Sequence, residues 1–261
     1  MGRRRREAPV SPPLLSTESL VKRFGGLAAT DGLSLSVAEG ELHALIGPNG
    51  AGKTTLIGQL SGELTPDSGT ILFDGRDVTR LPVHRRAQRG LARSFQITSI
   101  FPSFTALDNV ALAVQAHAGH SFRFWRDAGR DRRLADPARA VLERVGLGAR
   151  ADTRADALAH GEKRQLELAM ALATGPRLLL LDEPMAGMGP EDSARMVELL
   201  RELKGGVTIL LVEHDMDAVF ALADRITVLV RGKDLASGTP AQIRNDPAVR
   251  EAYLGDELEV A

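Results

Sequence analysis

The sequence predicts an α/β fold in which strands and helices alternate around a parallel sheet. Three observations support this prediction. A glycine-rich loop with a lysine separates a short apolar run at 42–46 from a stretch compatible with a helix. Two further strand-like runs, at 178–181 and 207–212, lie on either side of a segment with helical periodicity. Strands that alternate with helices favour parallel pairing, because each crossover helix returns the chain to the same end of the sheet.

Composition excludes several classes of protein. The chain has 261 residues, of which 43% are hydrophobic and 26% charged, so it is long enough to bury a sizeable core. The 33 basic and 34 acidic side chains give a formal net charge of −1, without the basic excess of proteins that coat nucleic acid, and we expect no nucleic-acid partner. The absence of cysteine excludes disulfides and thiolate metal sites. The apolar runs are much shorter than the ~20 residues that span a bilayer.

Residue types change along the chain in a way that suggests its organisation. The first 17 residues carry four consecutive arginines, at 3–6, followed by prolines, and we expect a disordered basic tail over 1–17 and a folded domain over 18–261. A hairpin pattern follows at 71–77. Nine arginines and five acids lie between residues 121 and 155, with apolar residues at helical spacing. This segment is typical of a helical insertion with a basic face.

The glycine-rich loop matches the phosphate-binding pattern G-x-x-x-x-G-K-[ST] at every constrained position. Its glycines allow a tight turn in which several N–H groups and the positive end of the next helix hold phosphates. Lys53 adds a full positive charge, and the Thr54 hydroxyl is suited to bind Mg²⁺. The predicted nucleotide-binding residues are Gly47, Pro48, Asn49, Gly50, Ala51, Gly52, Lys53, Thr54 and Thr55.

A second motif ends the apolar run at 178–181 with two acids, Asp182 and Glu183. This arrangement places carboxylates at the carboxyl edge of the sheet, where ligands bind in α/β folds. Asp182 is positioned to hold Mg²⁺. Glu183 is the candidate that orients or deprotonates the attacking water.

With these motifs the chain resembles the ATP-binding subunits of ABC transporters, from about Leu20 to Gly255. The resemblance implies a P-loop NTPase (RecA-like) core with an antiparallel β subdomain. It also implies a helical subdomain inserted over approximately 97–175 and a C-terminal extension over approximately 236–261.

Three more residues match this family. Phe24, in the segment 21–25, resembles the aromatic that stacks on adenine, although a core phenylalanine is the alternative. Gln96 resembles the glutamine that reaches the metal and the attacking water. His214, in the segment 212–215, resembles the histidine that contacts the γ-phosphate and holds the catalytic glutamate.

The family signature, Leu-Ser-Gly-Gly-Gln before a helix, appears here in altered form as Leu158, Ala159, His160, Gly161 and Glu162. In the family this loop closes over the ATP of a second subunit, so a dimer is implied. Alanine at 159 lacks the hydroxyl that is normally offered to the γ-phosphate, and position 189 is glycine where the family commonly has aspartate. We expect hydrolysis to be retained, because neither departure changes Lys53, Asp182, Glu183 or His214.

Within the family, the segments 90–96, 101–110, 236–240 and 252–255 resemble the branched-chain amino acid importer group. The resemblance implies an ATPase coupled to transport, with ATP and Mg²⁺ as cofactors, on the cytoplasmic face of the inner membrane. The implied partners are two membrane permeases, a second ATPase subunit of the same or a different kind, and indirectly an extracytoplasmic solute-binding protein. Aromatic residues at 101, 104 and 122–126 are candidates for the permease contact, or alternatively pack inside the helical subdomain.

Two alternatives remain at this point. Another ABC transporter, for urea, amides, other amino acids or lipopolysaccharide export, would have a similar ATPase. A soluble ABC ATPase that acts on ribosomes or DNA ends is a second alternative, but its relatives usually carry two cassettes or a long coiled coil, and this chain has neither pattern.

Overall fold

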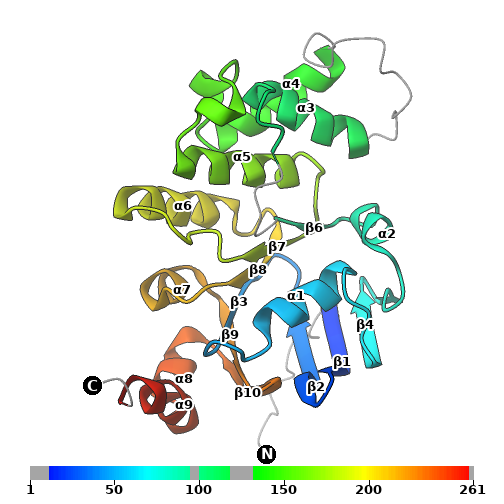
Figure 1. Cartoon of the computed structure of the whole chain (residues 1–261), viewed down its shortest axis with the longest axis vertical. Helices are drawn as coiled ribbons and strands as arrows, with labels where there is room; N and C mark the ends of the chain where they lie inside the picture. Colours follow the sequence, from blue (N-terminus) through cyan, green and yellow to red (C-terminus); the bar gives the residue numbers. More distant parts are fainter. Residues whose placement is uncertain (1–11, 95–99, 118–131, 259–261) are drawn as a thin grey trace, which may run out of the picture.

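The computed structural model describes residues 12–94, 100–117 and 132–258. Within these ranges the strands form two sheets, and several helices form a layer above the larger sheet (Figure 1). The smaller sheet contains β1 (Leu15–Phe24), β2 (Leu27–Val37), β4 (Ser68–Phe73) and β5 (Arg76–Asp77). The larger sheet contains β3 (Leu42–Ile46), β6 (Leu91–Arg93), β7 (Leu178–Asp182), β8 (Thr208–Val212), β9 (Arg225–Val230) and β10 (Lys233–Gly238).

The helices connect these strands. They are α1 (Lys53–Ser61), α2 (Val83–Ala87), α3 (Ala106–His117), α4 (Arg132–Arg144), α5 (His160–Leu172), α6 (Pro190–Leu203), α7 (Met216–Leu222), α8 (Pro240–Asn245) and α9 (Pro247–Leu258), with short 3₁₀ turns at Gly148–Arg150 and Ala155–Ala157. In this part of the chain no helix is both long and apolar enough to cross a membrane.

The larger sheet has the order β10-β9-β3-β8-β7-β6 and is parallel except at β10. This confirms the parallel sheet expected from the alternation of strands and helices. Because β3, β7 and β8 run in the same direction, their carboxyl ends meet at one edge. The predicted phosphate-binding loop, the two acids and the histidine lie at these carboxyl ends or directly after them.

The smaller sheet is antiparallel, with the order β2-β1-β4-β5, and includes the hairpin expected near residues 71–77. Strand β1 begins inside the predicted tail of 1–17, at Leu15, because Leu14 and Leu15 are buried in the apolar core. The rest of that tail, up to residue 11, lies outside the described residues.

Alternate residues of the larger sheet face two different cores. Leu179 and Leu181 of β7 pack on the side of the helical layer, whereas Leu178 and Leu180 face α1 and the smaller sheet. Helix α1 therefore has strands on both sides, and its amino end lies at the edge where β3 ends (Figure 1). Burial on both faces explains why β7 is a run of leucines and not an alternating pattern.

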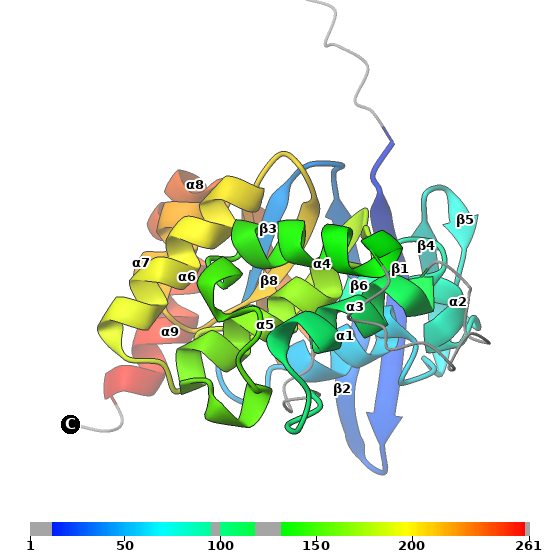
Figure 2. The ribbon, with the colours of Figure 1, turned by 90° about the horizontal axis from the view of Figure 1, so that it is seen from above.

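Helices α3, α4 and α5 form the upper layer in Figure 1, and Figure 2 shows this layer covering the sheet from above. They lie within the range 97–175 given above for the helical subdomain, which stays a prediction as a structural unit. At the other end of the molecule, α8 packs on α7, where the Arg244 guanidinium lies 4.4 Å from the centre of the Phe220 ring.

The carboxyl end of α1 is held by a buried arginine, Arg86 of α2. Its side chain is 1% exposed, and its guanidinium donates hydrogen bonds to the backbone oxygens of Gln59, Leu60, Thr79 and Leu81 at 2.7 to 2.9 Å. Burial lowers the pKa of Arg86 to about 10, so the group is still charged at neutral pH. Arg86 therefore satisfies carbonyls that the helix end leaves without intrahelical donors.

Candidate active site

The phosphate-binding loop joins β3 to α1 and is held in shape by contacts with neighbouring backbone. A Cβ added at Gly47 would lie 2.2 Å from the oxygen of Leu229, and one added at Gly52 would lie 2.1 Å from the oxygen of Ala29. Gly52 also has a φ of +104°, which side chains rarely adopt. The Gly232 N–H donates to the Ala51 oxygen at 2.9 Å from the β9–β10 turn. Glycine is therefore required at 47 and 52 by packing as well as by the turn.

Lys53, the first residue of α1, directs its ammonium group back over this loop. Nζ donates to the backbone oxygens of Gly47 at 2.6 Å and Pro48 at 3.1 Å. Burial lowers the pKa of Lys53, while Glu183 and Asp182 act in the opposite direction. The cation lies within the electrostatic influence of both acids, as a nucleotide site requires.

Asp182 ends β7 with a side chain that is only 1% exposed. Its Oδ2 accepts a hydrogen bond from Arg93 Nη2 at 3.2 Å, and β6, which carries Arg93, pairs directly with β7. Burial raises the pKa of Asp182, and Arg93 opposes that change.

Glu183 follows immediately and has a backbone φ of +50°, a conformation that costs energy for any residue with a side chain. The conformation is held by hydrogen bonds from the Glu183 N–H to the Val212 oxygen at 2.9 Å and from the Ala186 N–H to the Glu183 oxygen at 3.1 Å. The side chain is 31% exposed, and Oε1 lies 4.0 Å from Nδ1 of His214. The two residues predicted to act together are therefore neighbours.

Sequence reasoning missed Glu213, which lies at the end of β8 beside His214. Its side chain is 1% exposed, and its two oxygens accept the N–H groups of Met185 at 3.0 Å and His214 at 3.2 Å. Burial raises its pKa. Glu213 thus joins the loop after Glu183 to the loop that carries His214. An acid directly after a mainly apolar strand was the available indication in the sequence.

The remaining predicted nucleotide and metal residues lie as follows. Phe24 is 50% exposed at the β1–β2 turn, with Lys22 Nζ 5.7 Å from the centre of its ring, so it is not a core phenylalanine. Thr54 is exposed in the first turn of α1, and Thr55 is half-buried. Gln96 lies outside the described residues.

The altered signature begins α5. Leu158 is buried, whereas Ala159 and His160 are exposed. The Glu162 carboxylate accepts the Ala159 N–H at 2.8 Å, which is half of a capping box, but Ala159 has no side-chain oxygen to complete it. A Cβ added at Gly161 would lie 2.6 Å from the carboxylate carbon of Asp192 in α6. Glycine here allows the Asp192 side chain to pack closely against the start of α5, and a larger residue would displace that side chain.

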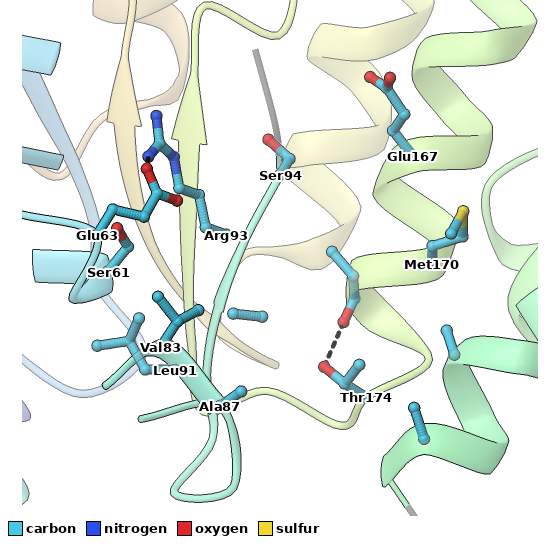
Figure 3. Close-up of a pocket in the computed structure, with 14 residues that line it drawn as sticks. Ser61, Glu63, Val83, Ala87, Leu91, Arg93, Ser94, Glu167, Met170 and Thr174 are labelled. Atoms are coloured by element: carbon cyan, nitrogen blue, oxygen red, sulfur yellow. Dashed lines mark hydrogen bonds and ion pairs between the residues drawn. The ribbon is translucent and has the colours of Figure 1, made fainter. Parts of the chain in front are cut away.

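A pocket of about 320 Å³ opens between α2, β6, α3 and α5, next to the acidic strand end (Figure 3). Its lining is mainly apolar, and includes Val83, Leu91 and Met170. Glu167 also lines it, and its Oε1 atom is buried with no hydrogen-bond partner among the described residues. No local pattern in the sequence indicates this pocket, because five separate segments form it, including the end of α1.

The sequence of this chain matches two family models and is similar to several known proteins. The family model described as ABC transporter matches residues 30–186, and the one described as branched-chain amino acid ATP-binding cassette transporter matches residues 235–259. The branched-chain amino acid transport ATP-binding protein BraF of Pseudomonas aeruginosa is 41% identical over 254 residues, which covers 95% of this chain and 100% of BraF. LivG of Escherichia coli, of the same description, is 42% identical over 259 residues with the same coverage.

Other relatives are also similar. The lipopolysaccharide export ATP-binding protein LptB of Acidithiobacillus ferridurans is 38% identical over 248 residues, with 95% of this chain and 99% of LptB covered. Among solved structures, an ATP-binding cassette of an ABC transporter in its ADP conformation has a TM-score of 0.83 and 31% sequence identity, and covers 94% of this chain and 100% of that one.

Proposed function

Because the chain belongs to the family of ABC transporter ATP-binding proteins, we propose that it hydrolyses ATP to drive a branched-chain amino acid importer. Family membership gives the ATPase activity. The observation that most strongly supports hydrolysis in this chain is the meeting of Lys53, Asp182, Glu183 and His214 at one edge of the larger sheet. The importer and its cargo are inferred from BraF and LivG, and from the match of the segment 235–259.

In this proposal each side chain has a distinct task. The loop amides and Lys53 bind the β- and γ-phosphates, and the exposed ring of Phe24 stacks on adenine. Glu183 accepts a proton from the attacking water or orients it, and His214 donates to the γ-phosphate while it holds Glu183. The backbone of Glu183, fixed by hydrogen bonds to both sides, keeps its carboxylate at the strand end.

The metal in the proposal is Mg²⁺, for which Thr54 and Asp182 offer oxygen donors; Gln96 is a third candidate by resemblance. The described residues contain no group of three His, Cys, Asp or Glu side chains suited to a metal. This fits an ion bound by few protein oxygens together with phosphates, as is usual for Mg²⁺. Bound there, Mg²⁺ would neutralise charge that develops on the phosphates.

The proposed partners are two permeases and a second ATPase subunit, which would place the chain peripherally at the inner membrane. The rings of Phe101 and Phe104 are 50% and 43% exposed, with centroids 5.5 Å apart. Buried Asn109 fixes their loop, because its side chain accepts the Phe101 N–H at 2.7 Å and donates to the Phe101 and Thr105 oxygens. Exposed aromatics on a loop that Asn109 holds in place suit contact with a permease helix.

The decisive experiment uses the ATPase purified with its membrane partners and placed in liposomes. We expect the ATPase rate to rise when a solute-binding protein loaded with leucine, isoleucine or valine is added, and the unloaded binding protein to have a smaller effect. Glu183→Gln should retain ATP binding and lose hydrolysis by at least a hundredfold.

Two results would contradict the proposal. An ATPase rate unchanged in Glu183→Gln would remove the assignment of that residue. Stimulation by lipopolysaccharide but not by amino acids would favour the export function of the relative LptB.

A further inference from the structure

The guanidinium of Arg93 lies between two carboxylates that come from distant parts of the chain. Nη1 is 2.5 Å from Oε2 of Glu63, which follows α1, and Nη2 is 3.2 Å from Oδ2 of Asp182 at the end of β7. The Arg93 side chain is 10% exposed, and Figure 3 shows it reaching Glu63 from β6. One cation is thus shared between two acids.

The position of Arg93 follows from the order of the strands. Arg93 pairs with Leu180 across the parallel ladder, and the Ser94 N–H donates to the Leu180 oxygen at 3.0 Å. These contacts fix the backbone of Arg93 beside Leu180, which lies two residues before Asp182 at the end of β7. The guanidinium contacts both carboxylates at once, so its hold on either one can change without movement of the backbone.

Arg93 differs from the buried Arg86 in the groups that its guanidinium contacts. Arg86 donates only to backbone oxygens, and all of its contacts hold structure in place. Arg93 instead binds two ionisable side chains, and its Nε is buried without a partner among the described residues. Because one guanidinium is shared between two carboxylates, neither acid has it to itself, and Asp182 can still attract a further cation.

We propose that Arg93 is a positioning residue that holds the Asp182 carboxylate in the absence of metal, and that it releases this carboxylate but keeps Glu63 when a divalent cation binds with the nucleotide. This rests on the proposed binding of ATP and Mg²⁺. Arg93 competes with the metal for Asp182, and Glu63 weakens that competition because it draws the same guanidinium away. The affinity of the site for the metal is then set by a residue that never touches it.

Because Arg93 competes with the metal, substitutions of Glu63 and of Arg93 should change the affinity for a divalent cation in opposite directions. In Glu63→Gln the full charge of Arg93 falls on Asp182, so the affinity for a divalent cation should fall three- to tenfold. In Arg93→Gln the carboxylate is released, and the affinity should rise by a similar factor. Charges this close interact strongly at the effective dielectric of a protein surface, which makes changes of this size expected.

The test measures Mn²⁺ binding to the full chain saturated with a non-hydrolysable ATP analogue, by electron paramagnetic resonance of the free Mn²⁺. Arg177→Gln is a matched control, because Arg177 also binds two carboxylates, those of Glu39 and Asp74, but on the surface. The control should leave Mn²⁺ affinity unchanged. Analogue binding in the presence of a chelator should be equal in all variants.

Opposite changes in Glu63→Gln and Arg93→Gln support the proposal. Changes in the same direction, or none, overturn it and leave Arg93 a structural residue. If Arg93→Gln does not fold, Glu63→Gln decides alone: weaker Mn²⁺ binding supports the proposal, and equal or tighter binding overturns it. Failure of the wild-type chain to bind the analogue at all would contradict the proposed function instead.

Discussion

The Glu213 carboxylate accepts the backbone N–H of Met185 at 3.0 Å and so joins the loops that carry Glu183 and His214. Because burial raises the pKa of Glu213 above its ordinary value of 4.5, the folded state disfavours the charged form. The protonated carboxyl therefore contributes to the free energy of unfolding. This contribution is fully present below pH 4.5 and is lost as the pH rises through the higher pKa of the folded state.

Glu213→Gln should therefore remove a pH-dependent part of stability. We expect the free energy of unfolding of the wild type, relative to that of the variant, to fall as the pH rises above 4.5, measured by urea unfolding. Glu202→Gln, at an exposed position of α6, is the control. A difference that is constant over this range would show that the charge state of Glu213 does not contribute.

Ala159→Ser should stabilise the chain and strengthen the signature. Position 159 has the extended backbone of a helix N-cap, and Glu162 already supplies the other half of a capping box. A serine hydroxyl there adds about 1 kcal/mol to the free energy of unfolding. It also restores a donor for the γ-phosphate, so the ATPase rate of the assembled transporter should rise. Ala157→Ser, two residues earlier and also exposed, should change neither quantity.

Arg86→Met should destabilise the chain by about 3 kcal/mol or more, because it leaves several buried carbonyls without donors. The neighbouring Arg85 provides a control, since the hydrogen bond of its guanidinium goes to the Gln88 side chain on the surface, and Arg85→Met should cost less than about 0.5 kcal/mol. Chemical unfolding of both variants measures the difference. An equal loss of free energy of unfolding in the two variants would show that water replaces Arg86 as the hydrogen-bond donor to these carbonyls.

Gly52→Ala should disrupt the phosphate-binding loop. The new methyl group would meet the Ala29 oxygen at 2.1 Å, and the backbone would be strained, at a cost of about 1 to 3 kcal/mol or a shift of the loop. ATP affinity should fall at least tenfold in a fluorescent-nucleotide titration. Gly26→Ala adds the same group where nothing lies within 4 Å, and should bind ATP normally.

The sequence predicted the parts of the site that are continuous in the chain. The loop at 47–54 and the acids at 182 and 183 were identified because their chemistry depends on local spacing, and the parallel sheet then brought them to one edge. Leu15 was assigned to the tail because the four arginines and the prolines before it suggested disorder, whereas burial of its side chain decides its place in β1.

What the sequence could not predict depends on which strands are neighbours. β6 and β7 are far apart in the chain and adjacent in the sheet, so the contact between Arg93 and Asp182 has no local pattern. The same is true of Gly161, whose packing partner Asp192 lies in a different helix. Both contacts join segments that are distant in the sequence, and no sequence motif relates the positions of the two partners.

The phosphate-binding loop has backbone of β9 behind Gly47 and of β2 behind Gly52. Its shape is consequently settled when the chain folds, and little conformational entropy remains to be lost when a nucleotide arrives. We therefore expect replacement of ADP by ATP to leave the backbone at Gly47 and Gly52 in place. If a second subunit pairs with this chain as proposed, we expect the motion of each cycle to lie in the approach and separation of the two subunits, while the loop keeps its shape.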